Sequence, residues 1–153
     1  MHYTTVLAGT IAALCTTAAA TSGYDVVNYC SDKKYLTISN NEQGVLSYND
    51  ELPAGTSRHY DIVGDHSLAV ANSTDYWNPS TAKLVLGTNS AGGVLYYAMG
   101  IANSYPLQGR ATTFTSSSCP NITTPDGSTK GCGDNNISFK WTLCTDVILG
   151  GPI

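Results

Sequence analysis

The chain is poor in charged residues, and this scarcity excludes several classes of partner. Only 12% of its 153 residues are charged, and seven Lys and Arg against eleven Asp and Glu give a formal net charge of −4. Lys33 and Lys34 form an isolated pair, and no basic cluster occurs. Because nucleic-acid binding needs cations that neutralise phosphates, we expect no nucleic-acid partner.

Long apolar segments are lacking after the first twenty residues. Residues 1–20 have an apolar centre and end in Ala18-Ala19-Ala20, which predicts a secretory signal peptide cleaved after Ala20. The alternative is a short membrane anchor, but the run is too short to cross about 30 Å of hydrocarbon. The remaining residues, 21–153, suit a single domain. We therefore expect a secreted, extracellular protein with no membrane insertion once the signal is removed.

Catalytic motifs are lacking as well. There is no Gly-x-Ser-x-Gly elbow, and the Gly-rich stretch 87–93 lacks the Lys of a phosphate-binding loop. A glycoside hydrolase would need two carboxylates flanking the scissile bond, and the candidates are Asp50, Glu51, Asp61, Asp65 and Asp75. Their places at strand ends and in loops favour ordinary solvated acids. His59 is expected on the outer face of a strand, with Tyr60 and Ile62 facing in. The sequence thus predicts no catalytic residue and no cofactor.

Helical periodicity is absent, and a period of two recurs in its place. Apolar and polar residues alternate in 34–39, 66–72, 81–87, 92–100 and 136–144. The last run is the clearest, and its apolar face consists of Ile137, Phe139, Trp141 and Leu143. Such alternation is typical of antiparallel strands with one face on a core. With Pro- and Gly-containing turns between the runs, it predicts an all-β, antiparallel β-sandwich, and it makes Trp141 a core residue.

One of the five cysteines leaves with the signal peptide, and the four that remain predict two disulfides with three possible connectivities. Cys119 and Cys132 share a polar segment, 115–136, which we expect to be a long surface loop pinned by a Cys119–Cys132 bond. Cys30 and Cys144 end the first and last expected strands, so a Cys30–Cys144 bond would staple the ends of the domain. A metal site is the alternative, but there is no Cys-x-x-Cys pair and secretion favours oxidation, so no metal is predicted.

Two further sets of residues are candidates for function. Three Asn-x-Ser/Thr triplets begin at Asn72, Asn121 and Asn136, and each is a candidate glycosylation site of a secreted protein. Exposed aromatic rings stack on sugars or anchor protein interfaces, so the candidate ligand-binding residues are Tyr76, Trp77 and Tyr105. The alternative for Trp77 is that its ring plugs one end of the sandwich.

Three sets of short motifs follow one another along the chain: Val27-Asn28-Tyr29-Cys30; Leu52, Gly55 and Ser57; and Tyr96-Tyr97, Gly100, Asn103 and Pro106. In this order they resemble motifs of thaumatin-like proteins, with Ala98 where that family prefers Asp. The short chain is similar to small fungal secreted proteins of the Blastomyces yeast-phase-specific (Bys1) type, over most of residues 24–146. This resemblance implies a β-sandwich in which the early cysteine bonds to one near the C-terminus. The chain has no room for the cysteine-rich domain and acidic cleft of large thaumatin-like proteins, which puts a cleft-based function in doubt.

These expectations favour a secreted, non-catalytic binding or interaction protein that acts at a cell wall or host surface, and thus a candidate effector. Its expected partner is a cell-wall glycan or a host extracellular protein. One alternative is a weak β-glucan hydrolase with paired carboxylates. The other is a structural or antigenic cell-wall protein.

Overall fold

The computed structural model describes residues 23–40, 42–61, 64–133 and 137–148, so the expected signal peptide, Ile62 and Asn136 lie outside the described residues. Within these ranges the chain forms ten β-strands and no helix. The strands are β1 (Gly23–Asn28), β2 (Lys34–Asn40), β3 (Gly44–Leu52), β4 (Ser57–Tyr60), β5 (His66–Ala71), β6 (Lys83–Ala91), β7 (Val94–Ala102), β8 (Arg110–Thr115), β9 (Lys130–Cys132) and β10 (Ser138–Ile148). Among the described residues, nothing resembles a membrane-spanning helix.

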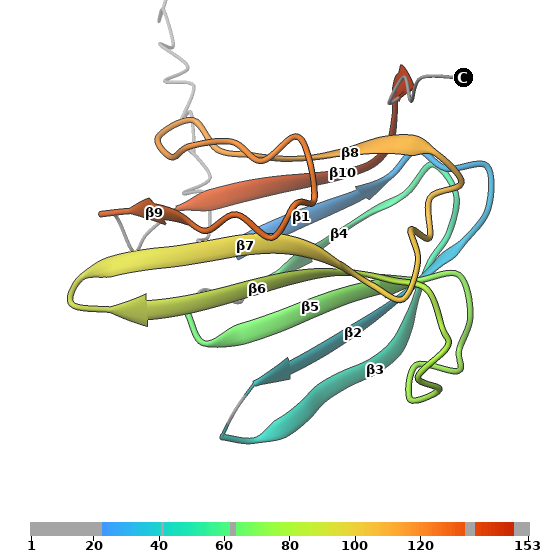
Figure 1. The fold of residues 1–153 in the computed structure, drawn as a ribbon, viewed down its shortest axis with the longest axis horizontal. Coiled ribbons are helices and arrows are strands. Elements are labelled where there is room, and N and C mark those ends of the chain that lie inside the picture. Colours follow the sequence, from blue (N-terminus) through green and yellow to red (C-terminus); the bar gives the residue numbers. More distant parts are fainter. Residues whose placement is uncertain (1–22, 41, 62–63, 134–136, 149–153) are drawn as a thin grey trace, which may run out of the picture.

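The strands form two sheets that pack face to face (Figure 1). The smaller sheet has the order β4-β1-β10-β8, and the larger has the order β3-β2-β5-β6-β7-β9. The predicted all-β sandwich is confirmed, with one difference from a purely antiparallel arrangement, since β1 and β10 pair in parallel. A tight turn forces neighbouring strands to be antiparallel. No such turn links the first strand to the last, so they are free to run in the same direction.

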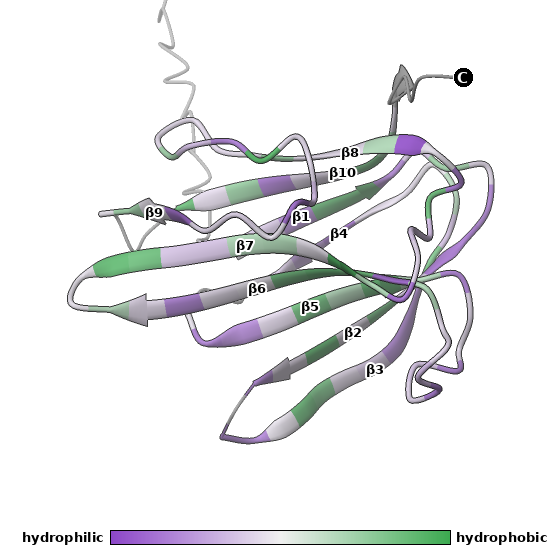
Figure 2. Cartoon of the chain, in the orientation of Figure 1, coloured by the Kyte–Doolittle hydropathy of each residue, from purple (hydrophilic) through white to green (hydrophobic). Residues whose placement is uncertain are grey.

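The core lies between the sheets and is built from the inward positions of the alternating strands. Trp141 on β10 is fully buried, as predicted, and its indole Nε1 donates to Thr112 Oγ1 at 2.9 Å. The rings of Phe114 and Phe139 stack with centroids 4.4 Å apart, and Tyr24 and Tyr97 pack around them. Figure 2 shows the hydrophilic and hydrophobic residues that alternate along β10. Burial of this face is the main contribution to the stability of the sandwich.

Residues 115–133, the described part of segment 115–136, have more order than the expected surface loop. Phe114 and Ile122 exchange backbone hydrogen bonds at 2.8 and 2.9 Å, and the short strand β9 pairs with β7 at the edge of the larger sheet. Ile122 and Pro125 are buried. The segment therefore extends the sandwich, because its few apolar side chains reach the core while its polar residues stay in water.

The structure contains a Cys30–Cys144 and a Cys119–Cys132 disulfide. Cys144 does not end its strand, since β10 continues to Ile148. A register shift between Leu143 and Thr145 marks a β-bulge, and Cys144 has a φ of 57°. Simple alternation would turn the residue after Leu143 outward. The bulge turns the Cys144 side chain into the core instead, where it meets Cys30 beyond the end of the neighbouring strand β1.

Candidate functional site

Three aromatic rings form an exposed cluster where the β5–β6 loop meets β3, and we call Tyr48, Tyr76 and Trp77 the aromatic surface. Tyr48 and Trp77 are nearly parallel, with centroids 6.3 Å apart and an interplanar angle of 20°. Tyr76 meets Trp77 edge-on at 5.0 Å. The Trp77 side chain is 66% exposed, which argues against its plugging the sandwich. Bulky apolar rings held open to water are typical of a binding surface.

The loop that carries Tyr76 and Trp77 is held to β3 and closed on itself by hydrogen bonds. On β3, Tyr48 Oη and Asn49 Nδ2 both donate to the carbonyl of Thr74, at 3.3 and 2.5 Å. Within the loop, Thr81 Oγ1 donates to the carbonyl of Asp75 at 2.7 Å. Lys83 Nζ donates to the carbonyl of Asn78 at 3.1 Å and lies 5.2 Å from the centroid of the Tyr76 ring. These contacts fix the positions of the rings before any ligand binds.

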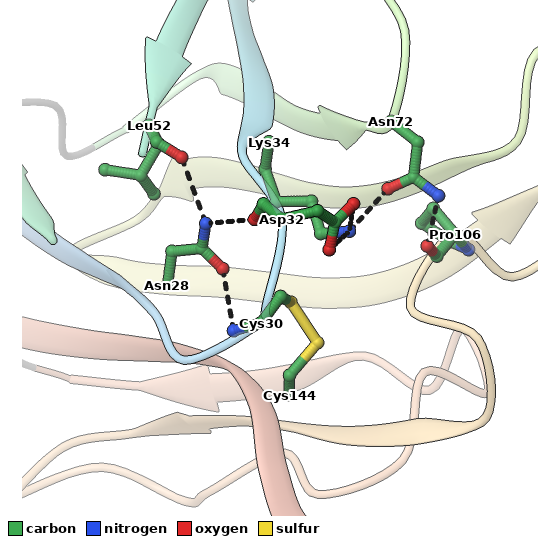
Figure 3. Close-up of polar contacts among 8 residues, drawn as sticks. All are labelled: Asn28, Cys30, Asp32, Lys34, Leu52, Asn72, Pro106 and Cys144. Atoms are coloured by element: carbon green, nitrogen blue, oxygen red, sulfur yellow. Dashed lines mark hydrogen bonds and ion pairs between the residues drawn. A yellow bond between two sulfur atoms is a disulfide. The ribbon is translucent and has the colours of Figure 1, made fainter. Parts of the chain in front are cut away.

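A buried lysine anchors the base of the loop (Figure 3). The side chain of Lys34 is only 1% exposed, and its Nζ donates to both carboxylate oxygens of Asp32, at 3.0 and 2.8 Å, and to Asn72 Oδ1 at 2.6 Å. Asn72 Nδ2 donates in turn to the carbonyl of Pro106 at 2.5 Å. The network therefore ties the start of the aromatic loop to β2 and to the segment after β7.

The Asn28 amide organises the turn beside the Cys30–Cys144 disulfide (Figure 3). Asn28 is fully buried, and its Nδ2 donates to the carbonyls of Asp32 and Leu52, each at 3.0 Å. Its Oδ1 accepts from the backbone N–H of Cys30 at 3.0 Å. One side chain thus satisfies three backbone groups, and its bonds to Leu52 and Cys30 are buried. It also positions Cys30 for its disulfide and Asp32 for its contact with Lys34.

Tyr105, the third predicted ligand-binding residue, is not part of the aromatic surface. Its ring is partly buried against the core, and its Oη donates to the carbonyl of Arg110 at 2.7 Å. Burial raises the pKa of Tyr105 to about 12. Tyr48, by contrast, belongs to the cluster although it was not among the residues predicted to bind a ligand. No local motif marks Tyr48, because its meeting with Trp77 depends on how the loop folds onto β3.

The candidate acids are spread over the surface, and each has its own hydrogen-bond or ion-pair partner. Glu51 accepts from Lys33 at 2.8 Å, and Asp65 accepts from Asn89 Nδ2 at 2.9 Å. Asp75 accepts from Asn78 Nδ2 at 2.9 Å. Asp50 pairs with Arg58 at 3.3 Å and so joins the edge strands β3 and β4 of the two sheets. These contacts are those of acids that stabilise turns and edges.

His59 lies between two carboxylates on the outer face of β4. Its Nδ1 is 2.7 Å from Asp25 Oδ1, and its Nε2 is 2.9 Å from Asp61 Oδ1. The contact with Asp25, reinforced by Asp61, raises the pKa of His59, while burial opposes the change. An inverting glycosidase leaves room for water between its carboxylates, but here the imidazole fills that space. Among the described residues, no group of His, Cys, Asp and Glu is placed to hold a metal ion.

The glycosylation candidates differ in their surroundings. The amide of Asn72 takes part in the Lys34 network on both its oxygen and its nitrogen. Asn121 is exposed, as Asn72 is, but only its Oδ1 has a hydrogen-bond partner among the described residues, accepting from the N–H of Ser116 at 3.1 Å. Asn121 is therefore the described candidate whose side chain is more open to modification.

The sequence matches the model of a known protein family. The model of the family described as Blastomyces yeast-phase-specific protein (Bys1) matches residues 11–145. No curated protein matches the sequence.

Two solved structures are similar to this fold. The protein elicitor MoHrip2 from Magnaporthe oryzae has a TM-score of 0.67 at 18% identity, and the match covers 81% of this chain and 99% of that one. The thaumatin-like xylanase inhibitor TLXI has a TM-score of 0.59 at 13% identity, over 81% of this chain and all of that one. At these identities the likeness establishes the thaumatin-like fold alone.

Proposed function

Because the chain belongs to the Blastomyces yeast-phase-specific protein family, we propose that it is a secreted, non-catalytic binding protein whose aromatic surface contacts an extracellular partner. The observation that supports this proposal best is the aromatic surface, in which the rings of Tyr48 and Trp77 are exposed, Tyr76 is partly buried, and the loop contacts hold them in place. Rigid aromatic side chains supply contact area at little cost in conformational entropy. Such a surface suits recognition.

A cell-wall glycan is the partner that we propose first, with a host extracellular protein as the other. Sugar rings have apolar faces that stack on aromatic side chains, and Trp77 and Tyr48 offer nearly parallel rings. Of the two neighbouring structures, one is named an elicitor and the other a xylanase inhibitor, so the fold is used by proteins that act through partners.

An extracellular location is part of the same proposal. Two disulfides in so short a chain suit an oxidising compartment, and the predicted signal peptide would deliver the chain there. Glycosylation of the exposed Asn121 accords with this location. The hydrolase alternative is less favoured, because the candidate acids have the local partners described above.

The test is retention of the secreted protein on insoluble cell-wall glycan, followed by an assay for released reducing sugar. We expect retention without release. The variant Trp77→Ala should weaken retention about tenfold, since a stacked ring contributes about 1 kcal/mol or more. Tyr29→Ala is the matched control, because Tyr29 is also exposed, at 57%, but lies outside the aromatic surface.

The outcomes separate the candidate functions. Sugar release by the wild type would favour the hydrolase. Absence of retention, together with absence of release, would favour a structural or antigenic wall protein. Equal retention of Trp77→Ala and wild type, with the fold intact, would remove the aromatic surface from the binding site.

A further inference from the structure

A shallow groove of about 290 Å³ lies against β6 and β7, away from the aromatic surface. Leu86 on β6 and Tyr97 on β7 are buried in the core, so their neighbours in each strand face outward. The outward residues that line the groove are Gly87, Asn89, Tyr96 and Ala98, joined by Thr129 from the segment before β9. We call this feature the β6–β7 groove.

The floor of the groove has almost no side chains. Gly87 lies opposite Ala98 in the β6–β7 pairing, and a Cβ added at Gly87 would meet no atom within 4 Å. Gly100, one step along the same face of β7, has the same open space. A flat ligand can therefore approach the backbone of the sheet closely, which residues of ordinary size at these positions would prevent.

An aromatic ring and polar groups border this floor. Tyr96 is 41% exposed, and its ring lies beside Gly131 of β9, where an added Cβ would be 3.5 Å from Tyr96 Cε1. The bond from Asn89 Nδ2 to Asp65 Oδ1 holds the Asn89 amide in place. All the lining residues are Gly, Ala, Thr, Asn or Tyr, and none carries a formal charge at pH 7. The groove thus offers a ring face, an amide and hydroxyls to a neutral ligand.

The pairing of the strands favours a sugar over an extended peptide as the ligand of the groove. Both strands are internal to the larger sheet, since β6 pairs with β5 and β7, and β7 pairs with β6 and β9. Their backbone groups in the groove are therefore engaged in the sheet, and a peptide cannot be added there as a further strand. Recognition falls to ring stacking and side-chain hydrogen bonds. We propose that the β6–β7 groove binds a sugar unit of a neutral oligosaccharide, an inference that rests on the proposed function.

The groove and the aromatic surface lie along one face of the larger sheet. Lys83, whose Nζ contacts the Tyr76 ring, faces outward from β6 because the next residue, Leu84, is buried. Gly87 follows four residues later on the same face, roughly 13 Å further along the strand. This distance exceeds one sugar ring. A single linear glycan that occupies both places must therefore be an oligosaccharide, and short fragments should bind more weakly than long ones.

Filling the floor of the groove tests this inference. Gly87→Val adds a β-branched side chain where the strand favours one and where the space is open, so the fold should be retained. We expect Gly87→Val and Tyr96→Ala each to weaken binding to soluble neutral β-glucan and xylan about tenfold. The control is Thr113→Val, a change to the same side chain on β8 of the other sheet. Binding is measured by affinity electrophoresis, and the fold by unfolding in urea.

Each outcome bears on one claim. Loss of binding in both groove variants, with Thr113→Val unchanged, supports the groove as a sugar subsite. Wild-type binding by Gly87→Val, with weakened binding by Trp77→Ala, overturns the groove and leaves the proposed function standing. Failure of the wild type to bind either β-glucan or xylan overturns the cell-wall glycan as the partner, and with it the groove as a sugar subsite. Preference for an anionic polymer such as polygalacturonate over the neutral glycans overturns the assignment of a neutral ligand.

Discussion

Individual side chains set how the stability of this protein responds to pH. The pKa values of the two described histidines shift in opposite directions. The contact with Asp25, and secondarily that with Asp61, raises the pKa of His59. Burial lowers the pKa of His66, which lies partly buried at the start of β5. Folding therefore favours the protonated form of one ring and the neutral form of the other.

The His59 contacts should make stability depend on pH. Because the folded-state pKa of His59 is above the unfolded value of about 6.5, its contribution is fully present below that pH. It should disappear as the pH rises through the folded-state pKa. In urea unfolding over a pH series, His59→Asn should be less stable than the wild type at acidic pH and equal to it at alkaline pH. His66→Asn is the control. Because the pKa of His66 is lowered, its replacement should instead increase the free energy of unfolding, and most strongly at acidic pH. A deficit in His59→Asn that is constant with pH would contradict this account.

At the scale of elements, the strands with regular alternation were predictable, and the edge strands β3 and β9 of the larger sheet were not. Regular alternation predicted β2, β5, β6, β7 and β10, because one face of each lies on the core. The edge strand β3 pairs with β2 through register shifts and leaves Val45, Leu46 and Tyr48 exposed, so its sequence has no simple period. The three residues of β9 are too few to show alternation.

The candidate site was predictable to the same extent. Tyr76 and Trp77 could be selected because their turn-rich surroundings indicate a loop. Tyr48 could not, because its strand was not recognised. Trp77 is exposed whereas Tyr105 is partly buried. This difference depends on packing between distant segments, which local sequence does not encode. The open floor at Gly87 likewise depends on the register of the β6–β7 pairing, which places the small residue Ala98 opposite it.

Lys34 should matter to the aromatic loop as well as to the stability of the fold. Lys34→Met keeps the apolar stem but removes the donors to Asp32 and Asn72. We expect the free energy of unfolding to fall by about 2 kcal/mol, because buried polar groups lose their partner. Glycan retention should also weaken, since Asn72 begins the loop.

The neighbouring lysine provides the control for this prediction. Lys33 and its partner Glu51 are each about half exposed. Lys33→Met should therefore leave the free energy of unfolding nearly unchanged. Equal losses in the two variants, measured by urea unfolding, would show that burial of Lys34 has no special role.

At the scale of the whole molecule, the two disulfides should contribute unequally. Cys30–Cys144 joins residues 114 apart in sequence, whereas Cys119–Cys132 joins residues 13 apart. Because the longer loop restricts the unfolded chain more, replacing both cysteines of the first pair by Ala should cost about 4.8 kcal/mol, against about 3 kcal/mol for the second pair. Denaturant unfolding of the two double variants measures the difference. A larger loss from the Cys119–Cys132 pair would contradict the entropic account.

The parallel pairing of β1 and β10 has a mechanical consequence. In a parallel pair, the first residue of one strand and the last residue of the other lie at opposite ends of the sheet. Tension applied through the chain before β1 and after β10 therefore pulls the two strands past each other along their length. The Cys30–Cys144 disulfide lies just beyond the last rung of the ladder that runs from Gly23–Ser138 to Asn28–Leu143, so it opposes this sliding and carries the load covalently. A domain built in this way resists stretching where a terminal hairpin would unzip.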